Sequence, residues 1–303
     1  LTLHAQEIDS IHIQGEFDNK EAVECIDYVN EERALYGIRN ATVSDCTFDG
    51  PADGESALKE TNNLFVERCY FNLRYPFWHC TNTTIREVTM TEGCRAALWY
   101  DNDITLENST LNGIKALREC QNVQLHECTI VSPEFAWRCS NLQISNCNLT
   151  SEYPFFECKN MEFNNFTLTG KYSFQYIENV TISNSKLNTK DAFWHGKNVT
   201  VMDSVIRGEY LGWYSENLKL VRCHIIGTQP FCYCKGLVLE NCTLEGCDLS
   251  FENSEVQATI KGHIDSIKNP ICGHIEADSI GEIILEKERI DTSKTSIICH
   301  NPA

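Results

Sequence analysis

A repeat of nineteen residues constrains the fold of this chain more than any other feature of its sequence. Its pattern is Asn-x-x-hydrophobic-x-polar-Cys/Ser-x-hydrophobic, with clear copies in NVQLHECTI from Asn122, NLQISNCNL from Asn141 and NVTISNSKL from Asn179. The aligned copies begin at residues 40, 63, 82, 103, 122, 141, 160, 179, 198, 217 and 236. Every step from 103 onward is nineteen residues, and the earlier steps indicate small insertions, the largest around residues 49–55. The chain therefore contains about eleven copies of one structural unit.

Each copy predicts short strands separated by bends. Apolar residues at offsets one, three, six and eight fit two alternating strands, and a third strand precedes the next copy, as in YPFFEC from Tyr153. Three strands per coil predict an all-β, single-stranded parallel β-helix of about eleven coils, in which each strand pairs with its copy about 4.8 Å away. We expect an N-terminal cap over residues 1–30, the β-helix over 31–252 and a β-rich C-terminal cap over 253–303.

The first position of the motif is Asn in nine copies, Asp103 in one and Gly236 in one. These residue types tolerate a left-handed backbone best, so the column predicts a turn with positive φ in every coil. Stacked Asn amides would also hydrogen-bond from coil to coil.

The seventeen cysteines are an odd number, which cannot all pair within one chain. Eleven of them fall in two inward columns of the repeat, one with Cys46, Cys69, Cys128, Cys147, Cys223 and Cys242 and the other with Cys80, Cys120, Cys139, Cys158 and Cys234. Because free Cys behaves as a small buried hydrophobe, we expect reduced core thiols rather than disulfides. Unpaired thiols favour a cytoplasmic location, which the sequence otherwise leaves open.

The sequence predicts no metal and no cofactor. Cys232-x-Cys234 lacks the second Cys pair or the His spacing of a zinc site. His263 and His274 suit capping residues with ordinary hydrogen bonds better than metal ligands.

Charge and hydropathy exclude two classes of partner. The net charge of −18 argues against nucleic acid, because binding to phosphate backbones needs clustered Lys and Arg. The longest apolar runs are a few residues, far below the roughly 18 needed to span a membrane. We therefore expect a soluble protein without a membrane partner.

Several segments resemble one bacterial family, the domain-of-unknown-function family 3737. They are GESALKE from Gly54, RYPFWH from Arg74, KYSFQY from Lys171, TKDAFWH from Thr189, EYLGWYS from Glu209 and GTQPFCYC from Gly227. The resemblance covers most of the chain and implies a right-handed β-helix of the pectate-lyase-like kind. It implies no catalytic residues, and the wider fold favours a carbohydrate ligand by analogy only. The polygalacturonase Asp-Asp and Gly-His-Gly motifs and the pectate-lyase Arg-x-Pro-x-x-Arg are absent from the sequence, so the question of an enzyme stays open.

Two adjacent columns of the third strand are bulky and apolar, and neighbours in a strand face opposite ways. The first column includes Phe77, Phe155, Phe174, Phe193 and Phe231 and no polar residue. The second column contains Tyr36, Lys59, Trp78, Trp99, Arg118, Trp137, Phe156, Gln175, Trp194, Trp213 and Cys232. Burying Lys59, Arg118 or Gln175 without a partner would be costly, so we expect the tryptophans to face outward. The opposite register is the alternative.

The tryptophan column and the polar column beside it predict a long shallow groove. The expected ligand-binding residues are Trp78, Trp99, Arg118, Trp137, Gln175, Trp194 and Trp213. The candidate catalytic residues are Glu119, Arg138, Glu157, Tyr176 and His195. Glu119 and Glu157 would lie about 9.6 Å apart by the strand spacing, near the upper limit for an inverting glycosidase pair. A lyase would instead need a base and a group that neutralises a uronate, roles open to Arg118, Arg138, Tyr176 or His195.

Two functions fit this groove. A glycan-binding or glycan-processing site would stack sugar rings on indole faces. A protein interface, in a homo-oligomer or against the chain's own termini, would cover the same tryptophans. The third alternative is a self-covered surface without a ligand, in which the charged residues form only a salt-bridge ladder.

Overall fold

The computed structural model describes residues 21–24, 28–29, 34–49 and 56–301, and over them the chain is a parallel β-solenoid. It has about 13 turns of about 19 residues each, which confirms the predicted fold class. The turns outnumber the predicted eleven because strands outside the recognisable repeat also pair in parallel, such as β1 (Glu21–Glu24) with β3 (Arg39–Ser44). The predicted insertion lies largely at 50–55, outside the described residues. Among the described residues no helix is long and apolar enough to cross a bilayer.

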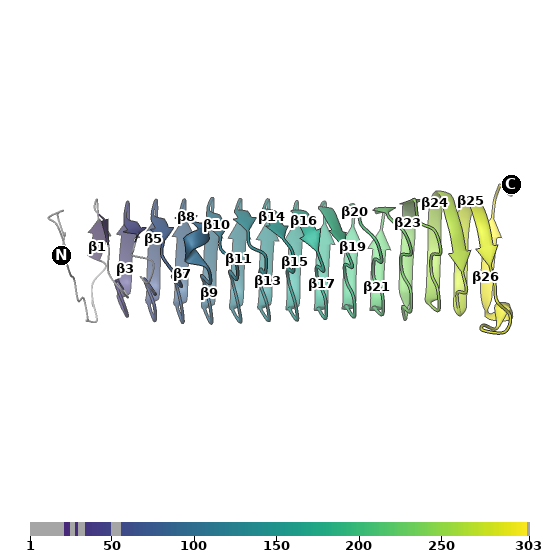
Figure 1. Cartoon of the computed structure of the whole chain (residues 1–303), viewed down its shortest axis with the longest axis horizontal. Helices are drawn as coiled ribbons and strands as arrows, with labels where there is room; N and C mark the ends of the chain where they lie inside the picture. The colour runs from purple at the N-terminus through teal and green to yellow at the C-terminus, as the bar shows by residue number, and fades with distance from the viewer. Residues whose placement is uncertain (1–20, 25–27, 30–33, 50–55, 302–303) are drawn as a thin grey trace. The chain divides into compact units, whose positions relative to one another are not determined.

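The chain divides into two compact units, Leu1–Ser151 and Glu152–Ala303. Figure 1 shows the strands of each unit stacked side by side, from purple to teal in the first unit and from teal to yellow in the second. The only helical segments in the described part are two short 3-10 turns, η1 (Glu92–Cys94) and η2 (Thr292–Lys294). The predicted caps at residues 1–30 and 253–303 remain predictions.

In the first unit, each coil contributes one longer and one shorter strand. The longer strands are β3, β5 (Asn62–Glu67), β7 (Thr81–Arg86), β9 (Asn102–Glu107), β11 (Gln121–His126) and β13 (Ser140–Ser145). The shorter strands are β2 (Tyr28–Val29), β4 (Thr47–Asp49), β6 (Tyr70–Asn72), β8 (Thr89–Met90), β10 (Thr110–Asn112), β12 (Thr129–Val131) and β14 (Asn148–Ser151). Val123 is paired with Ile104 on one side and Leu142 on the other, so equivalent apolar residues form one buried row.

The second unit continues the same pattern within itself. Its longer strands are β15 (Lys159–Asn164), β17 (Glu178–Ser183), β19 (Lys197–Met202), β21 (Glu216–Val221), β23 (Leu237–Glu245), β24 (Glu255–Lys268) and β25 (Cys272–Ile284). Its shorter strands are β16 (Thr167–Lys171), β18 (Lys186–Lys190), β20 (Val205–Arg207), β22 (His224–Ile226) and β26 (Thr295–Cys299). The last strand, β26, pairs with Gly273–Ala277 of β25.

The third side of the coil is a run of bends rather than the regular strand that the sequence suggested. In the first unit, Tyr75, Phe77 and His79 all have positive φ (61°, 57° and 58°), so every second residue is left-handed. A regular ladder is therefore broken into isolated bridges such as Trp78 to Trp99. Backbone bonds still join the coils, and the Phe77 N–H donates to the Ala57 carbonyl at 3.0 Å.

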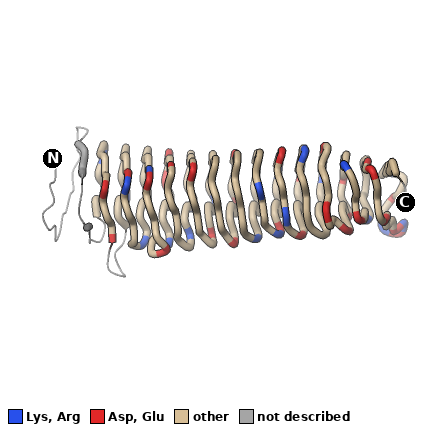
Figure 2. Tube along the Cα trace, turned by 90° about the horizontal axis from the view of Figure 1, so that it is seen from above, with Lys and Arg blue, Asp and Glu red and all other residues tan. Residues whose placement is uncertain are grey.

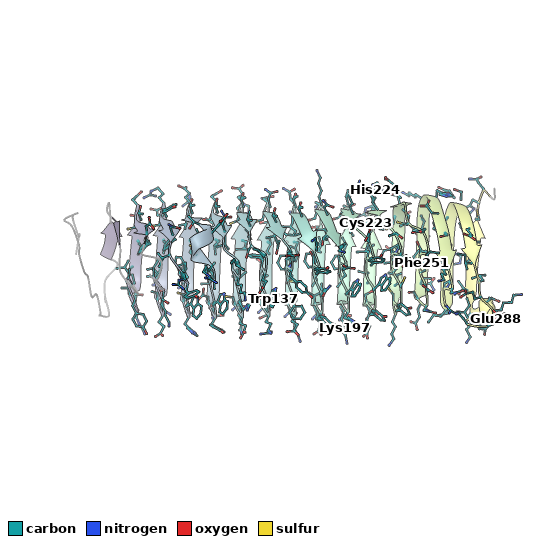
Figure 3. The ribbon with its side chains drawn as sticks, in the orientation of Figure 1. Trp137, Lys197, Cys223, His224, Phe251 and Glu288 are labelled. Carbon is teal, nitrogen blue, oxygen red and sulfur yellow. The ribbon has the colours of Figure 1, made fainter. Side chains whose placement is uncertain are left out.

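The phenylalanine column faces inward, as expected. In the second unit Phe155, Phe174 and Phe193 are fully buried, and the rings of Phe155 and Phe174 stack with centroids 4.8 Å apart. Figure 3 shows the buried Phe251 within the coils and the exposed Lys197 at their edge. The column thus supplies the solvent-free core on which the third side rests.

The Asn column adopts the predicted left-handed turns and amide ladder. In the first unit Asn122 and Asn141 have φ of 56° and 58°, and Asn141 Nδ2 donates to Asn122 Oδ1 at 2.8 Å. In the second unit Asn179 Nδ2 donates to Asn160 Oδ1 at 3.1 Å.

The described cysteines form no disulfide with one another, and those of the two inward columns are buried. Their role goes beyond that of a small hydrophobe, because they bond the buried backbone of the bends. The Cys128 N–H donates to the Cys147 sulfur at 3.3 Å, and the Cys147 thiol donates to the Ser145 carbonyl at 3.2 Å. Where Ser replaces Cys the same bond forms, since the Phe166 N–H donates to Ser185 Oγ at 3.1 Å. The column therefore selects small side chains with a polar atom.

Candidate functional site

In the first unit the tryptophan column is a continuous stack, which we call the first stripe (Trp78, Trp99, Arg118 and Trp137). The Trp78 and Trp99 rings are parallel, with centroids 4.9 Å apart. The Arg118 guanidinium lies over the rings of Trp99 and Trp137, at 4.8 and 4.6 Å from their centroids. Arg118 thus takes the place of one aromatic ring through cation–π contacts.

The indoles of the first stripe are half-buried and fixed at their edges. Trp78 Nε1 donates to the Ala96 carbonyl at 2.7 Å, and Trp99 Nε1 donates to the Lys115 carbonyl at 2.6 Å. The tryptophans face outward, as expected from the sequence, but neighbouring coils cover the faces of the stacked rings. What the stripe presents to solvent is ring edges.

Two of the charged candidates lie next to each other in the first unit. Arg138 donates to Glu119 at 3.3 Å, and both side chains are exposed. Arg118 pairs with Glu134 at 2.9 Å, while its Nε is buried without a hydrogen-bond partner. Glu119 and Arg138 thus form the expected ion pair. Glu157 belongs to the second unit, so the paired-carboxylate hypothesis for Glu119 and Glu157 remains a prediction.

The second unit has its own tryptophan pair. Trp194 and Trp213 stack with centroids 5.5 Å apart, and their Nε1 atoms donate to the Tyr210 and Gln229 carbonyls, each at 2.8 Å. Gln175 occupies the same column and is buried. Its Nε2 donates to the Asp191 carbonyl at 3.5 Å, so its amide makes the bond that an indole N–H makes elsewhere.

The polar column of the second unit is a stack of three exposed tyrosine rings and one half-buried histidine ring, which we call the Tyr/His stack (Tyr176, His195, Tyr214 and Tyr233). Successive centroids are 4.8, 5.0 and 4.8 Å apart, with interplanar angles of 9°, 8° and 7°. Tyr176, Tyr214 and Tyr233 are 50%, 42% and 37% exposed. Because the faces are stacked, the edges with their polar atoms form the exposed part. The candidates Tyr176 and His195 are therefore members of one ordered row.

Sequence reasoning missed a polar group beside this stack. The Tyr153 hydroxyl donates to Gln175 Oε1 at 2.8 Å, and the Asp191 side chain is only 8% exposed. Burial raises the pKa of Asp191, although Lys190 opposes the shift. Burial also raises the pKa of Tyr153, and nearby Tyr176, Tyr172 and Asp191 add to it. The sequence does contain a signal for Asp191. The equivalent positions in the two adjacent coils are Tyr172 and Tyr210, so an acidic residue stands where the neighbouring coils have tyrosine.

The described part of the chain has no cluster of three or more His, Cys, Asp or Glu residues arranged to hold a metal ion. His263 Nδ1 is 2.9 Å from Ser279 Oγ, and His274 Nε2 is 3.7 Å from Glu276. Both histidines therefore have ordinary polar partners. Acidic and basic residues are interspersed over the coils of each unit (Figure 2).

The sequence of residues 24–298 matches a family described as a protein of unknown function, DUF3737. The chain belongs to this family. No curated protein matches the sequence of this DUF3737 member.

Solved structures share only the general fold of the DUF3737 chain. The adhesin PfbA of Streptococcus pneumoniae is 10% identical, with a TM-score of 0.41 over 80% of this chain and 84% of that one. A tailspike protein of Escherichia coli bacteriophage HK620, in complex with a pentasaccharide, is 10% identical, with a TM-score of 0.40 over 88% and 64%. The A-module of a mannuronan C-5 epimerase from Azotobacter vinelandii is 8% identical, with a TM-score of 0.31 over 82% and 89%.

Proposed function

We propose that the second unit binds a linear carbohydrate along the Tyr/His stack. The observation that carries this proposal is the regular row of exposed polar edges, one per coil, with centroids 4.8–5.0 Å apart. A pyranose ring and its linkage are about as long as this repeat, so an extended glycan can place one sugar against each coil. Tyrosine edges offer a hydroxyl next to apolar ring carbon, a combination that suits sugar hydroxyls and C–H groups.

The geometry changes how the aromatic residues would contact a sugar. Stacking on indole faces, the expected mode, is blocked where Trp194 and Trp213 cover each other. The ring edges and hydroxyls supply the contacts instead. Because stacking holds each ring in one orientation, little side-chain freedom is lost when a ligand binds.

A glycan array followed by calorimetry tests this proposal. The double variant Tyr214→Phe/Tyr233→Phe removes two hydroxyls and keeps the stack. We expect it to bind about 2- to 10-fold more weakly per hydroxyl, the usual range for an uncharged hydrogen bond. Tyr70→Phe, at an exposed tyrosine of β6 in the first unit, is the matched control. Equal affinity of the double variant and the wild type would contradict the proposal.

A protein interface is the second candidate, and the first stripe favours it. The faces of Trp78 and Trp99 are already covered, and the stripe combines Trp and Arg, the residue types that dominate interface energetics. Light scattering separates the two functions. A stable dimer that binds no glycan would favour the interface, whereas a monomer with a clear glycan signal favours the carbohydrate surface.

A further inference from the structure

The tryptophan column of the second unit is interrupted at Gln175. Trp194 and Trp213 follow it in the next two coils and stack on each other. Gln175 keeps the edge hydrogen bond of an indole, through Nε2 to the Asp191 carbonyl, but brings no ring. Its other amide atom, Oε1, accepts the Tyr153 hydroxyl at 2.8 Å. The interruption is therefore an ordered polar site inside an otherwise aromatic column.

Asp191 is the unusual member of this site. Its side chain is more than nine-tenths buried, yet no described residue donates a hydrogen bond to its carboxyl group. The nearest cation is Lys190, whose Nζ is 4.0 Å from Oδ2, at the outer limit of an ion pair. Buried carboxyl groups normally have hydrogen-bond donors, and the exceptions in native structures call for an explanation.

The fold does not explain the choice of Asp at this position. Asp191 has φ of 55°, a conformation that Asp tolerates, but Tyr172 and Tyr210 adopt φ of 47° and 57° in the adjacent coils. A tyrosine therefore fits the same backbone. Because the Asp191 side chain forgoes ring packing and its carboxyl group accepts no hydrogen bond from a described residue, the side chain contributes little to the stability of the coil.

We propose that Asp191, with Gln175, is an anchoring subsite that accepts hydrogen bonds from two neighbouring hydroxyls of one neutral sugar ring. This inference rests on the proposed function and adds the residue that fixes the position of the glycan on the Tyr/His stack. A carboxylate has two oxygens that can take two vicinal hydroxyl donors, and these hydroxyls supply the donors that the protein lacks. Asp191 stands four residues before His195 in the same coil, so the subsite adjoins the stack.

The protonation of Asp191 adds a second readout. Burial raises the pKa of its carboxyl group, and the groups that face it are Lys190, Glu209, Tyr153 and Tyr172. The ionised form accepts two hydroxyls, whereas the protonated form accepts fewer. Glycan affinity should therefore fall as the pH drops through the pKa of Asp191, and this dependence should disappear in Asp191→Asn.

Calorimetry with the full chain and three neutral β-1,4-linked hexasaccharides, of glucose, mannose and xylose, tests the subsite. We expect Asp191→Asn to bind at least about 10-fold more weakly, as for the loss of charge-assisted hydrogen bonds, with an unchanged or higher melting temperature. Asp191→Tyr, which restores the residue type of the adjacent coils, should fold and also lose binding. Asp203→Asn, at an exposed carboxylate paired with Arg222, is the matched control and should bind like the wild type.

Each result has a distinct meaning. If the wild type binds and Asp191→Asn binds equally well, the subsite is wrong while the proposed function stands. If the wild type binds none of the three sugars, both are overturned. A lower melting temperature with unchanged affinity would assign Asp191 a structural role. Stronger binding of a glucosamine hexasaccharide than of the neutral ones would replace hydroxyl recognition with an ion pair to an amine.

Discussion

The indole of Trp99 lies parallel to that of Trp78, at a centroid distance of 4.9 Å and an angle of 6°. The other face of Trp99 is covered by Arg118, 4.8 Å from the ring centroid. An outward-facing tryptophan is thus enclosed by its neighbours in the stack. Facing outward and being available to a ligand are different properties in a solenoid, because side chains in register bury one another.

The first prediction is that Trp99→Ala destabilises the protein by about 2–3 kcal/mol. The variant loses ring stacking, which contributes about 0.5–1.5 kcal/mol, and the hydrogen bond to the Lys115 carbonyl, about another 0.5–1.5 kcal/mol, besides the buried apolar area. Urea unfolding measures the loss. Tyr70→Ala, at an exposed ring of the same unit, should cost much less. A loss below about 0.5 kcal/mol for Trp99→Ala would show that the stack is not a stabilising element.

The second prediction concerns the cysteine column, in which Cys147 accepts the Cys128 N–H at 3.3 Å. Cys147→Ser keeps an acceptor at this position, whereas Cys147→Val keeps the approximate size and removes it. We expect the Val variant to be about 1–2 kcal/mol less stable than the Ser variant, because a buried N–H is left without a partner. Denaturant unfolding of both variants checks this. If Cys147→Val were the more stable variant, the cysteine column would stabilise the fold by hydrophobic packing alone.

The other cysteine column, which contains Cys120 and Cys139, predicts low thiol reactivity in the native state. Cys120 and Cys139 are buried, and burial raises the pKa of Cys120 well above that of an ordinary thiol. Since the thiolate is the reactive form, these cysteines should react with a thiol reagent only after denaturation. Recovering fewer than half of the cysteines after denaturation without reductant would indicate disulfides instead.

The coil period, the Asn turns and the inward phenylalanines could be predicted from the sequence, because each depends on one residue column and one simple periodicity. Val123 and Leu125 illustrate this, as alternation alone points both inward. The third side was less predictable. Its alternating left-handed residues, such as Phe77 and His79, are of types that rarely adopt positive φ, so local propensity points to a strand there.

For the candidate site, the sequence predicted which residues share a column but not how their side chains contact one another. The sequence gives no view of ring planes, so the covered faces of Trp78 and Trp99 could not be foreseen. Asp191 was missed because the groove was predicted from the tryptophan column and the polar column next to it, and Asp191 lies in neither. The partners that make it unusual come from other coils. Contacts between side chains of different columns depend on how far neighbouring coils are shifted relative to each other, and the repeat length does not specify this shift.

The fourth prediction is that Asp101 makes the stability fall as pH rises. Asp101 is fully buried, its Oδ1 accepts the Cys80 N–H at 2.7 Å, and its Oδ2 has no partner. Burial raises its pKa well above 3.8, so the folded state holds a proton that the unfolded chain releases. The stabilisation by Asp101 is fully present at a pH below the pKa of its carboxyl group in the unfolded chain. It is lost as the pH rises through the pKa in the folded protein, and the free energy of unfolding then falls by about 1.4 kcal/mol per pH unit.

Asp101→Asn checks this relationship, because the amide is neutral at every pH and keeps the acceptor for Cys80. Unfolding between pH 5 and pH 8 should show a shallower slope in the variant and a higher stability than the wild type at pH 8. Identical slopes would mean that Asp101 does not hold its proton in the folded protein.

The last prediction concerns the attachment of the final strand, β26, to β25. His300 Nε2 lies 2.8 Å from Glu276 Oε1, and this bond, with a further contribution from His274, lowers the pKa of Glu276 below 4.5. Because this pKa is lowered, the ionised Glu276 stabilises the folded protein at a pH above the pKa of Glu276 in the unfolded chain. This stabilisation is lost as the pH falls through the pKa in the folded protein. Amide exchange in Thr295–Cys299 should therefore accelerate relative to the intrinsic rate as the pH falls through the lowered pKa of Glu276, whereas exchange in β17 should not. Glu276→Gln should show faster exchange in β26 already at pH 7. Unchanged protection of β26 in that variant would mean that the backbone pairing with Gly273–Ala277 alone holds the strand.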